Sequence, residues 1–423
     1  MANGFSKEEV VAFDRMLEAY QDALVASKMA TVVTLDQTQM ERTGDIMWFP
    51  QPYIMASYSG NDATNNFKDV AQLAVPGVID TQKHTPWTLT ARELRDAAQE
   101  GRIRDAAYQR LASDINVDVT TKASLMGSIV VKRTVAATGF DDVALADTVF
   151  TTQGVPREQR MMGLTPGNYN NMAANLASRV LDNSKSLKAY ERASLGDVAG
   201  FDTYKLDYGY RLAAATATGV TITNTQPLYY TPVANTETSG GVFVNVDNRF
   251  QIISIAVTGS TVKVGDCFTI ADVNAVHHIA KLDTGQLKTF RITRIVTGAG
   301  GTGTVEITPP IISATGGTGP ELQYQNVTAA PANGAAITFL NTAAADVNPF
   351  WQGDAMQILP GRLKPRVDSG MAVIQGTTDN GFQLTMTRQG NINNLDTKYR
   401  VDAIWGSFAA NPEMMGIEIF SQT

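Results

Sequence analysis

The chain has 423 residues, a length at which one hydrophobic core usually gives way to two or three subdomains. Its formal net charge of -7 at pH 7 argues against a DNA-binding module, because such proteins gain affinity from clustered cations. Hydrophobic residues make up 43% of the sequence, yet no apolar run reaches the length of a bilayer span, so we expect no membrane association.

The amino-terminal sequence MANGFSKEEVVAFDRMLEAY lacks the basic and apolar regions of a signal peptide. We therefore expect the chain to fold in the cytoplasm. The single cysteine, Cys267, lies in the apolar run VGDCFTI. A lone cysteine cannot form an internal disulfide, so the sequence predicts a small buried thiol without a redox role.

A first helix is predicted close to the amino terminus. Ser6 and Glu9 fit a capping box, and Asp14 and Glu18 share one flank of the helix, which suits either solvent or a basic partner. Apolar residues recur with helical spacing at Val10, Phe13, Leu17, Tyr20 and Leu24. This narrow apolar seam is equally consistent with packing on the chain's own body and with packing on another chain.

The segment from Trp48 to Trp87 is polar and has no regular periodicity. Turn signals stand at Ser59-Gly60-Asn61 and at Pro76-Gly77. Because a connection of this length is uncommon in a compact domain unless it is functional or disordered, we expect an extended, two-stranded loop that becomes ordered against a neighbouring molecule.

A long helix is predicted next. After a short helix from Thr90 to Ala98 and a break at Gly101, apolar residues recur every fourth position from Ile103 to about Met126, and Gly127 ends the pattern. Charges of both signs are mixed along this spine helix, which favours a solvated face over nucleic-acid contact.

Mixed α and β segments follow, and the composition then changes. Helices are predicted near Val143 to Thr151, Tyr169 to Val180 and Lys185 to Arg192, with strands near Arg160 to Thr165 and Val198 to Leu206. From about Leu212 to Asn348 the sequence is rich in Thr and Gly and poor in charge. This composition, with frequent turn residues, predicts a β module inserted into an α+β host.

The inserted module is expected to be a small barrel of six to eight short strands. They are predicted at Val220 to Thr223, Leu228 to Thr231, Val242 to Val246, Phe250 to Val257, Val262 to Ile270, Val276 to Ala280, Phe290 to Val296 and Thr304 to Thr308. Host strands resume near Met356 to Leu359, Gly381 to Thr387, Tyr399 to Ala409 and Gly416 to Phe420.

No motif in the chain indicates catalysis. Residues 298–303 satisfy G-x-G-x-x-G, but the residues after them predict a strand, whereas a phosphate site needs a helix there; a glycine-rich hairpin is the better interpretation. The three histidines are His84, His277 and His278, and none is spaced for metal binding or general-base work. We expect no enzyme, no metal and no cofactor.

The segment VNVDNRF, residues 244–250, predicts a hairpin corner in which Arg249 pairs with Asp247. The preceding segment from Asn235 to Gly241 is a flexible polar loop. It is either an ordinary surface loop or an arm that reaches another subunit.

Five strings, in this order and spacing, resemble the major coat proteins of short-tailed lambdoid bacteriophages. They are RELRD at 92–96, VAGFD at 198–202, VNVDNRF at 244–250, VEITP at 305–309 and NPFWQGDA at 348–355. The resemblance covers nearly the whole chain. It implies the tailed-phage capsid fold, known as the Hong Kong ninety-seven fold, with peripheral and apical domains and an inserted six-stranded β-barrel.

The resemblance also implies a domain organisation. The expected parts are an amino-terminal arm (1–48), an extended loop (49–87), a peripheral domain with the spine helix (88–138), a first part of the apical domain (139–216), the inserted barrel (217–342) and a carboxy-terminal part of both host domains (343–423).

The implied function is that of a major capsid protein. It would form hexamers and pentamers of an icosahedral head, guided by a scaffolding protein, with a portal at one vertex and packaged double-stranded DNA inside. The virion would be its final location. A carbohydrate-binding or adhesive protein with a β module stays as the alternative, because the inserted segment is rich in Thr and Gly.

The resemblance suggests contact residues. Asp14 and Glu18 match the scaffold-facing arm, and the loop that holds Asn235, Glu237 and Gly241 matches a segment that contacts a neighbouring capsomer. The complete set of predicted contact residues is Asp14, Glu18, Lys68, Lys83, Asn235, Glu237, Gly241, Asp247 and Arg249. Lys68, Lys83 and the asparagines of Asn391 to Asn394 have the residue types of the Lys–Asn crosslinks in some relatives, but no crosslink is expected in this branch.

Overall fold

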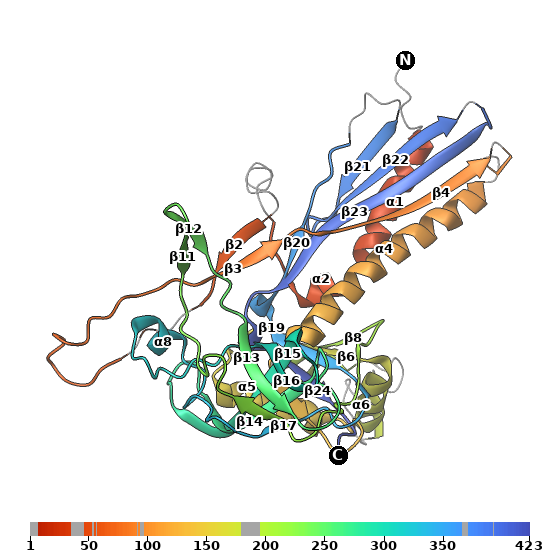
Figure 1. Cartoon of the computed structure of the whole chain (residues 1–423). Helices are drawn as coiled ribbons and strands as arrows, with labels where there is room; N and C mark the ends of the chain where they lie inside the picture. Colours follow the sequence, from red (N-terminus) through yellow and green to blue (C-terminus); the bar gives the residue numbers. More distant parts are fainter. Residues whose placement is uncertain are drawn as a thin grey trace. The chain divides into compact units, whose positions relative to one another are not determined.

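The structure is a computed structural model that describes residues 7–34, 46–52, 55, 57–90, 92–93, 97–178, 195–365, 371–391 and 393–423. The chain forms two compact units, and each is assembled from separate stretches of sequence (Figure 1). Unit 1 consists of Met1–Met47, Gly77–Thr120 and Gln357–Phe408, and unit 2 of Trp48–Pro76, Thr121–Met356 and Ala409–Thr423. The predicted α+β class is confirmed.

Unit 1 is built on a six-stranded sheet. Its order is β1-β20-β23-β22-β21, and β4 pairs with β23. The strands are β1 (Thr31–Val32), β4 (Thr81–Thr90), β20 (Met356–Pro360), β21 (Ala372–Thr377), β22 (Gln383–Asn391) and β23 (Asp396–Ala409). Figure 1 shows β4, β23, β22 and β21 side by side as long strands.

The predicted first helix is confirmed as α1 (Lys7–Ala23), and a single turn, α2 (Ala26–Met29), follows it. Phe13 and Tyr20 are buried. Gly376 of β21 leaves the space that Phe13 and Leu17 fill, since a Cβ there would lie 2.7 Å from the Phe13 ring. The apolar seam therefore packs on the chain's own unit. Ser6, the first half of the predicted capping box, lies outside the described residues.

The spine helix, α4 (Ala97–Met126), is confirmed, but the predicted break at Gly101 is wrong. An interior glycine costs a helix only about 1 kcal/mol relative to alanine, and burial of Ala107, Leu111 and Ile115 outweighs that cost. The helix ends before Gly127, as predicted. Of the short helix predicted from Thr90 to Ala98, residues 91 and 94–96 lie outside the described residues, and Thr90 is the last residue of β4.

Strand β4 occupies part of the segment in which the sequence predicts a loop. It pairs with β23 from Thr81 opposite Trp405 to Thr90 opposite Asp396, and Trp87 stacks on Tyr399 with ring centroids 5.5 Å apart. The strand was missed because most of its side chains are exposed or half-buried and therefore polar. The loop itself runs from 51 to 73, between the paired strands β2 (Ile46–Pro50) and β3 (Ala74–Val78).

Unit 2 holds a second sheet, which we call the host sheet, of order β5-β24-β19-β6-β8-β7. Its strands are β5 (Ile129–Lys132), β6 (Arg160–Leu164), β7 (Asp197–Val198), β8 (Phe201–Lys205), β19 (Asn348–Gln352) and β24 (Met415–Ile419). The helices α5 (Phe140–Gln153) and α6 (Pro166–Ser178) match two predicted helices; the third, at 185–192, lies outside the described residues. Phe150, Phe201 and Phe350 form a buried trio with centroids 4.8 to 5.8 Å apart.

The inserted segment forms a third six-stranded sheet, the inserted sheet, of order β10-β13-β16-β15-β14-β17. Its strands are β10 (Thr221–Thr223), β13 (Gln251–Val257), β14 (Cys267–Val276), β15 (Asp283–Thr297), β16 (Gly301–Thr308) and β17 (Ile337–Phe339). Its core includes Ile253, Phe268, Phe290 and Ile307. The glycines of 298–303 form the β15–β16 hairpin, which confirms the hairpin interpretation.

The two edge strands of the inserted sheet meet without a continuous ladder. A single bridge joins Thr221 to Ala336, with hydrogen bonds from Ile222 N to Ala335 O (2.9 Å) and from Ile337 N to Val220 O (2.9 Å). The sheet is thus strongly curled, but a closed six-stranded barrel is not shown.

Several strand limits within the inserted segment differ from those predicted. Residues 228–231 are not a strand, residues 277–280 form a turn, and β14 starts at Cys267 rather than at Val262. Of these runs, Leu228 and Val262 pack on the core of the inserted sheet, whereas Ile279 is exposed. A segment without strand structure that packs on a core is also rich in apolar residues, so its sequence cannot be told from that of a buried strand.

Candidate functional site

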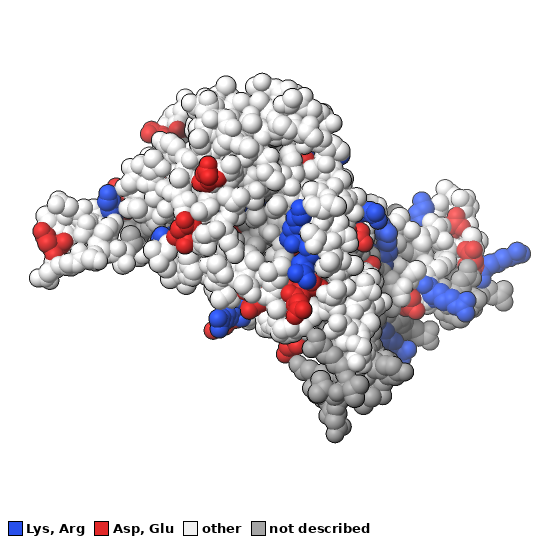
Figure 2. Space-filling view, turned by 90° about the horizontal axis from the view of Figure 1, so that it is seen from below, with Lys and Arg blue, Asp and Glu red and all other residues white. Residues whose placement is uncertain are grey.

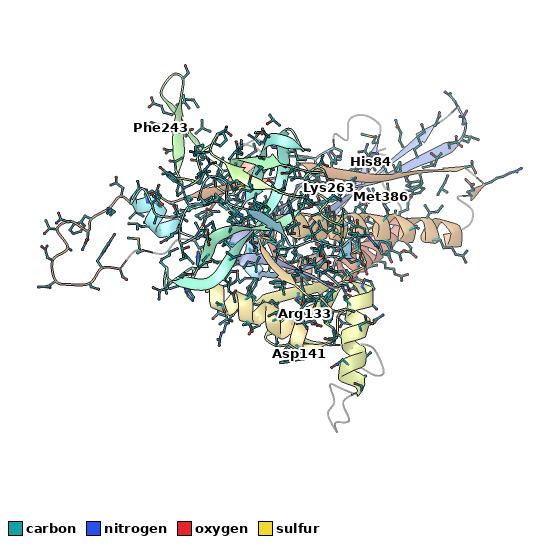
Figure 3. The ribbon with its side chains drawn as sticks, turned by 60° about the horizontal axis from the view of Figure 1, so that its bottom comes forward. His84, Arg133, Asp141, Phe243, Lys263 and Met386 are labelled. Carbon is teal, nitrogen blue, oxygen red and sulfur yellow. The ribbon has the colours of Figure 1, made fainter. Side chains whose placement is uncertain are left out.

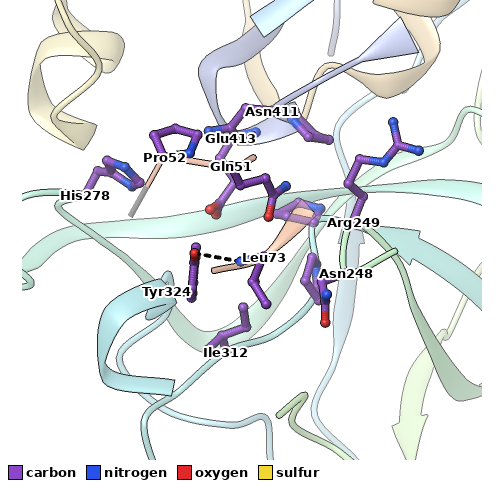
Figure 4. Close-up of a pocket in the computed structure, with 13 residues that line it drawn as sticks. Gln51, Pro52, Leu73, Asn248, Arg249, His278, Ile312, Tyr324, Asn411 and Glu413 are labelled. Carbon is purple, nitrogen blue, oxygen red and sulfur yellow. Dashed lines mark hydrogen bonds between the residues drawn. The ribbon is translucent and has the colours of Figure 1, made fainter. Parts of the chain in front are cut away.

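The described residues contain no group of three or more His, Cys, Asp or Glu side chains placed to hold a metal ion. No described helix is both long and apolar enough to span a membrane. One small, partly open cavity in unit 2, of about 30 Å³, is lined by Arg249, His278, Tyr324 and Glu413 among others (Figure 4). It has room for a water molecule or two and not for a substrate.

An exposed hairpin is the first candidate contact surface. It consists of β11 (Asn235–Thr238) and β12 (Val242–Asn245), with Glu237 opposite Phe243. Figure 3 shows Phe243 on this hairpin, away from the strands of the inserted sheet. Phe243 is 65% exposed, although an isolated two-stranded hairpin has little stability of its own. The predicted contact residues Asn235, Glu237 and Gly241 all lie here, and all are exposed.

The base of the hairpin is fixed by a buried amide. Asn248 Oδ1 accepts hydrogen bonds from Val233 N (3.1 Å) and Tyr230 Oη (3.0 Å), and Asn248 Nδ2 donates to Val233 O and Val246 O, both at 2.9 Å. These four bonds use both ends of one side chain, so the hairpin leaves the sheet in a defined direction.

The predicted pairing of Arg249 with Asp247 is confirmed. Arg249 Nη2 lies 2.6 Å from Asp247 Oδ2, and Arg249 Nε lies 2.9 Å from Asp247 Oδ1. The guanidinium also donates from Nη1 to Ala409 O at 2.7 Å. Arg249 is only 8% exposed, and these contacts lie within the chain. A contact of this pair with another subunit remains a prediction.

The loop between β2 and β3 is the second candidate surface. Phe67 is 85% exposed, and with Tyr58 and Leu322 it lines a surface hollow of about 280 Å³. Lys68 lies beside Phe67, and its Nζ donates to Gly317 O at 3.0 Å. The loop is thus held by the turn before α8 (Gly319–Tyr324). Its residue Leu73 is buried against Ile312 and Tyr324, while Phe67 and Val70 are exposed.

The remaining predicted contact residues lie in unit 1. Asp14 and Glu18 are exposed on α1, four residues apart. Lys83 is exposed on β4, next to His84, which Figure 3 labels. Lys68 and Lys83, which share the residue type of the crosslinks in some relatives, belong to different units.

Charges on the face in Figure 2 are scattered, and blue and red atoms alternate over a mostly uncharged surface. No continuous basic patch is visible on that face. This distribution agrees with the acidic composition of the chain.

Cys267 is fully buried at the start of β14, and burial raises the pKa of its thiol to about 11. Since the thiolate is the reactive form, we expect a thiol reagent to leave the native chain unlabelled near neutral pH and to label it fully once urea unfolds it. Mass spectrometry of the reagent-treated chain measures both states. Rapid labelling of the native chain would contradict the buried position.

Sequence reasoning missed the exposed apolar residues of the two surfaces. Phe67 stands in the polar run NNFKDV and Phe243 in the run GGVFVN. An isolated aromatic residue in a segment that lacks a core of its own is a signal for a contact surface, and it was available in the sequence.

Comparison with known proteins gave the following matches. A family model described as "P22 coat protein - gene protein 5" matches residues 1–421. Among solved structures, the chain is similar to the capsid structure of cyanophage P-SCSP1u (12% identity, TM-score 0.43, covering 93% of this chain and 87% of that chain). It is also similar to the CUS-3 coat protein I-domain (37% identity, TM-score 0.23, covering 30% of this chain and 98% of that chain).

Proposed function

Since the chain belongs to the P22 coat protein family, we propose that its two exposed surfaces, the β11–β12 hairpin and the β2–β3 loop, join copies of the chain in a shell. The chain is a major capsid protein and has the α+β capsid fold of that family. It is a structural component of an icosahedral phage shell in the virion, not an enzyme.

One observation carries the proposal: large apolar side chains are exposed on segments that have no core beneath them. Phe67 on the loop and Phe243 on the hairpin are both exposed. Burying such a side chain in a contact contributes roughly 2 kcal/mol, and a shell repeats each contact many times. Moderate contacts are sufficient for a closed shell and allow errors to be corrected during assembly.

Finer features of assembly follow as proposals from the family assignment. The shell consists of hexamers and pentamers, a scaffolding protein guides assembly in the host cytoplasm, a portal occupies one vertex, and double-stranded DNA fills the interior without sequence-specific contact. Asp14 and Glu18 are suited to a basic scaffold segment, since both are exposed on one helix. The domain limits expected from the sequence, with the insertion at 217–342, stay part of this proposal; the separate core of the inserted sheet supports them.

Substitution of Phe67 by serine tests the proposal. We expect the F67S variant to fold with unchanged monomer stability, because the side chain contacts solvent, and to form few or no closed shells when it is expressed together with a scaffolding protein. Negative-stain electron microscopy counts the shells, and urea unfolding measures the monomer.

Thr64→Ser, in the same loop and exposed, is the matched control and should assemble normally. Normal numbers of closed shells from F67S would refute a role of the loop in contacts between copies.

A further inference from the structure

Two segments of unit 2, residues 127–130 and 409–413, lie against each other; we call them the paired host segments. The first follows the end of α4, and the second leads from β23 to β24. Ser128 donates two hydrogen bonds to Pro412 O, from N at 3.3 Å and from Oγ at 2.7 Å. Backbone pairing holds part of them, since residues 129–130 belong to β5 and pair with β24, and Ala410 N and Asn411 N both donate to Ala355 O.

Strand β15 of the inserted sheet supplies contacts to the first segment. Thr289 Oγ1 donates to Ser128 O at 2.6 Å and accepts from Val130 N at 3.3 Å. Arg291 Nη1 donates to Gly127 O at 3.3 Å, directly after the last residue of α4. A cation at this place is favourable, because the carboxyl end of a helix carries partial negative charge.

The inserted sheet also holds the second segment. Lys288 Nζ lies 2.9 Å from Glu413 Oε1, and the Lys288 side chain is nearly completely buried. Arg249 Nη1 donates to Ala409 O at 2.7 Å. Removing one partner of a buried ion pair leaves an uncompensated charge, so such a contact is costly to break.

Arg291 is a fully buried side chain whose Nε and Nη2 have no hydrogen-bond partner among the described residues. Within the inserted segment its charge lowers the pKa of Asp266, against the burial that raises it. Unpartnered buried donors cost stability, and an apolar residue would fill the same place at less cost. Its one side-chain hydrogen bond among the described residues goes to Gly127 O, the residue that follows α4, so it links the inserted sheet to the first paired host segment.

We propose that Arg249, Lys288, Thr289 and Arg291 form a clamp by which the inserted sheet locks the paired host segments closed. The insertion is therefore a brace for the points at which the chain leaves α4 and enters β24. Local opening of these segments requires the clamp to break, even when both the host sheet and the inserted sheet stay folded.

Amide hydrogen exchange on the full-length, unassembled chain tests the clamp. In the Lys288→Met variant we expect exchange in residues 409–413 to become faster by roughly tenfold or more, because Glu413 loses its partner, while the inserted core exchanges as before. Ala410 N is a direct reporter, since it donates to Ala355 O at 2.8 Å in the closed state.

Arg294→Met is the matched control. Arg294 lies on the same strand, and its ion pair with Glu306 (2.7 Å) is largely exposed on the arginine side; this variant should leave exchange in both paired host segments unchanged. Equal exchange in Lys288→Met and in the control would overturn the proposal, as would a uniform increase over the whole chain.

Thr289→Val is a second variant for the same exchange experiment, and it tests the clamp even if Lys288→Met does not fold. Valine has nearly the shape of threonine and removes only the hydroxyl bonds to Ser128 O and Val130 N. We expect faster exchange confined to residues 127–130; protection equal to that of the unchanged chain would refute the clamp at this segment.

Shell formation gives a separate readout, and only this part rests on the proposed function. A subunit whose segments open cannot present the same contacts to every neighbour, so Lys288→Met should give irregular aggregates in place of closed shells. If exchange changes as expected but shells form normally, the clamp stands and its role in assembly is refuted. If F67S also forms normal shells, the proposed contact surface fails and the clamp is unaffected.

Discussion

Replacement of Phe290 by alanine is expected to destabilise the chain by about 3–5 kcal/mol, the usual cost of removing a buried phenylalanine. Phe290 is fully buried on β15 and packs against Phe268 with ring centroids 5.7 Å apart. Because the inserted sheet has its own core, the loss should concentrate there. Urea unfolding measures the free energy, and hydrogen exchange shows which residues open.

Leu287→Ala is the matched control for Phe290→Ala, since Leu287 lies on the same strand with its side chain exposed. It should change stability by less than about 0.5 kcal/mol. Faster exchange in F290A confined to residues 217–342 would support the proposed domain limits. Equal loss of protection throughout unit 2 would contradict them.

Replacement of Glu418 by glutamine is expected to stabilise the chain at alkaline pH. Glu418 is completely buried on β24, and neither of its carboxylate oxygens has a hydrogen-bond partner in the part of the chain that the structure describes. Burial, with the charge of Asp142 adding to it, raises the pKa of Glu418 to about 8, although Arg133 opposes the shift. Arg133 already pairs with Asp142 at 2.7 Å, so its positive charge is shared between Asp142 and Glu418.

The sign of the pH effect follows from the two pKa values of Glu418. In the unfolded chain the carboxyl ionises near 4.5, whereas in the folded chain it keeps its proton up to about pH 8. Between these values folding takes up a proton, so stability falls as the pH rises. The full loss, on the order of 4 kcal/mol, is reached above the folded pKa.

Glutamine keeps the shape of the side chain and cannot ionise. The E418Q variant should therefore match the unchanged chain near pH 4, below the unfolded pKa, and exceed its stability near pH 9, as measured by urea unfolding. Glu158→Gln, an exposed carboxylate of the same unit, is the control and should follow the unchanged chain at both pH values. Parallel pH curves for E418Q and the unchanged chain would show that the buried acid is not protonated.

Some features of the fold were predictable because their sequence signal is local. The apolar period of α1 and of α4, the turn residues of the β15–β16 hairpin and the Asp247–Arg249 corner each depend on residues close in sequence, and the structure confirms all four. Strand β4 was not predictable in this way. Its partner, β23, lies some three hundred residues later, and only that pairing makes its polar residues a strand.

Glu418 illustrates why the buried charges could not be predicted. It stands in the run MGIEIF, where alternation of apolar and polar residues normally indicates an exposed polar face. Every residue of β24 is instead buried, so both faces of this strand of the host sheet are covered. Lys288 and Arg291 were missed for the same reason, since charged residues on a strand are read as exposed.

The sequence by itself determined the class of the protein, because composition, periodicity and the coat-protein strings run along the chain and need no knowledge of what lies opposite. It also predicted an inserted β module, whose limits stay a proposal, and it shows no catalytic motif. Tertiary structure alone decided which loop residues are exposed, which acids and bases are buried, and which strand of the inserted sheet contacts the paired host segments. Burial and pairing depend on residues far apart in the chain, and the free energy of a charge depends on how much water its neighbours leave around it.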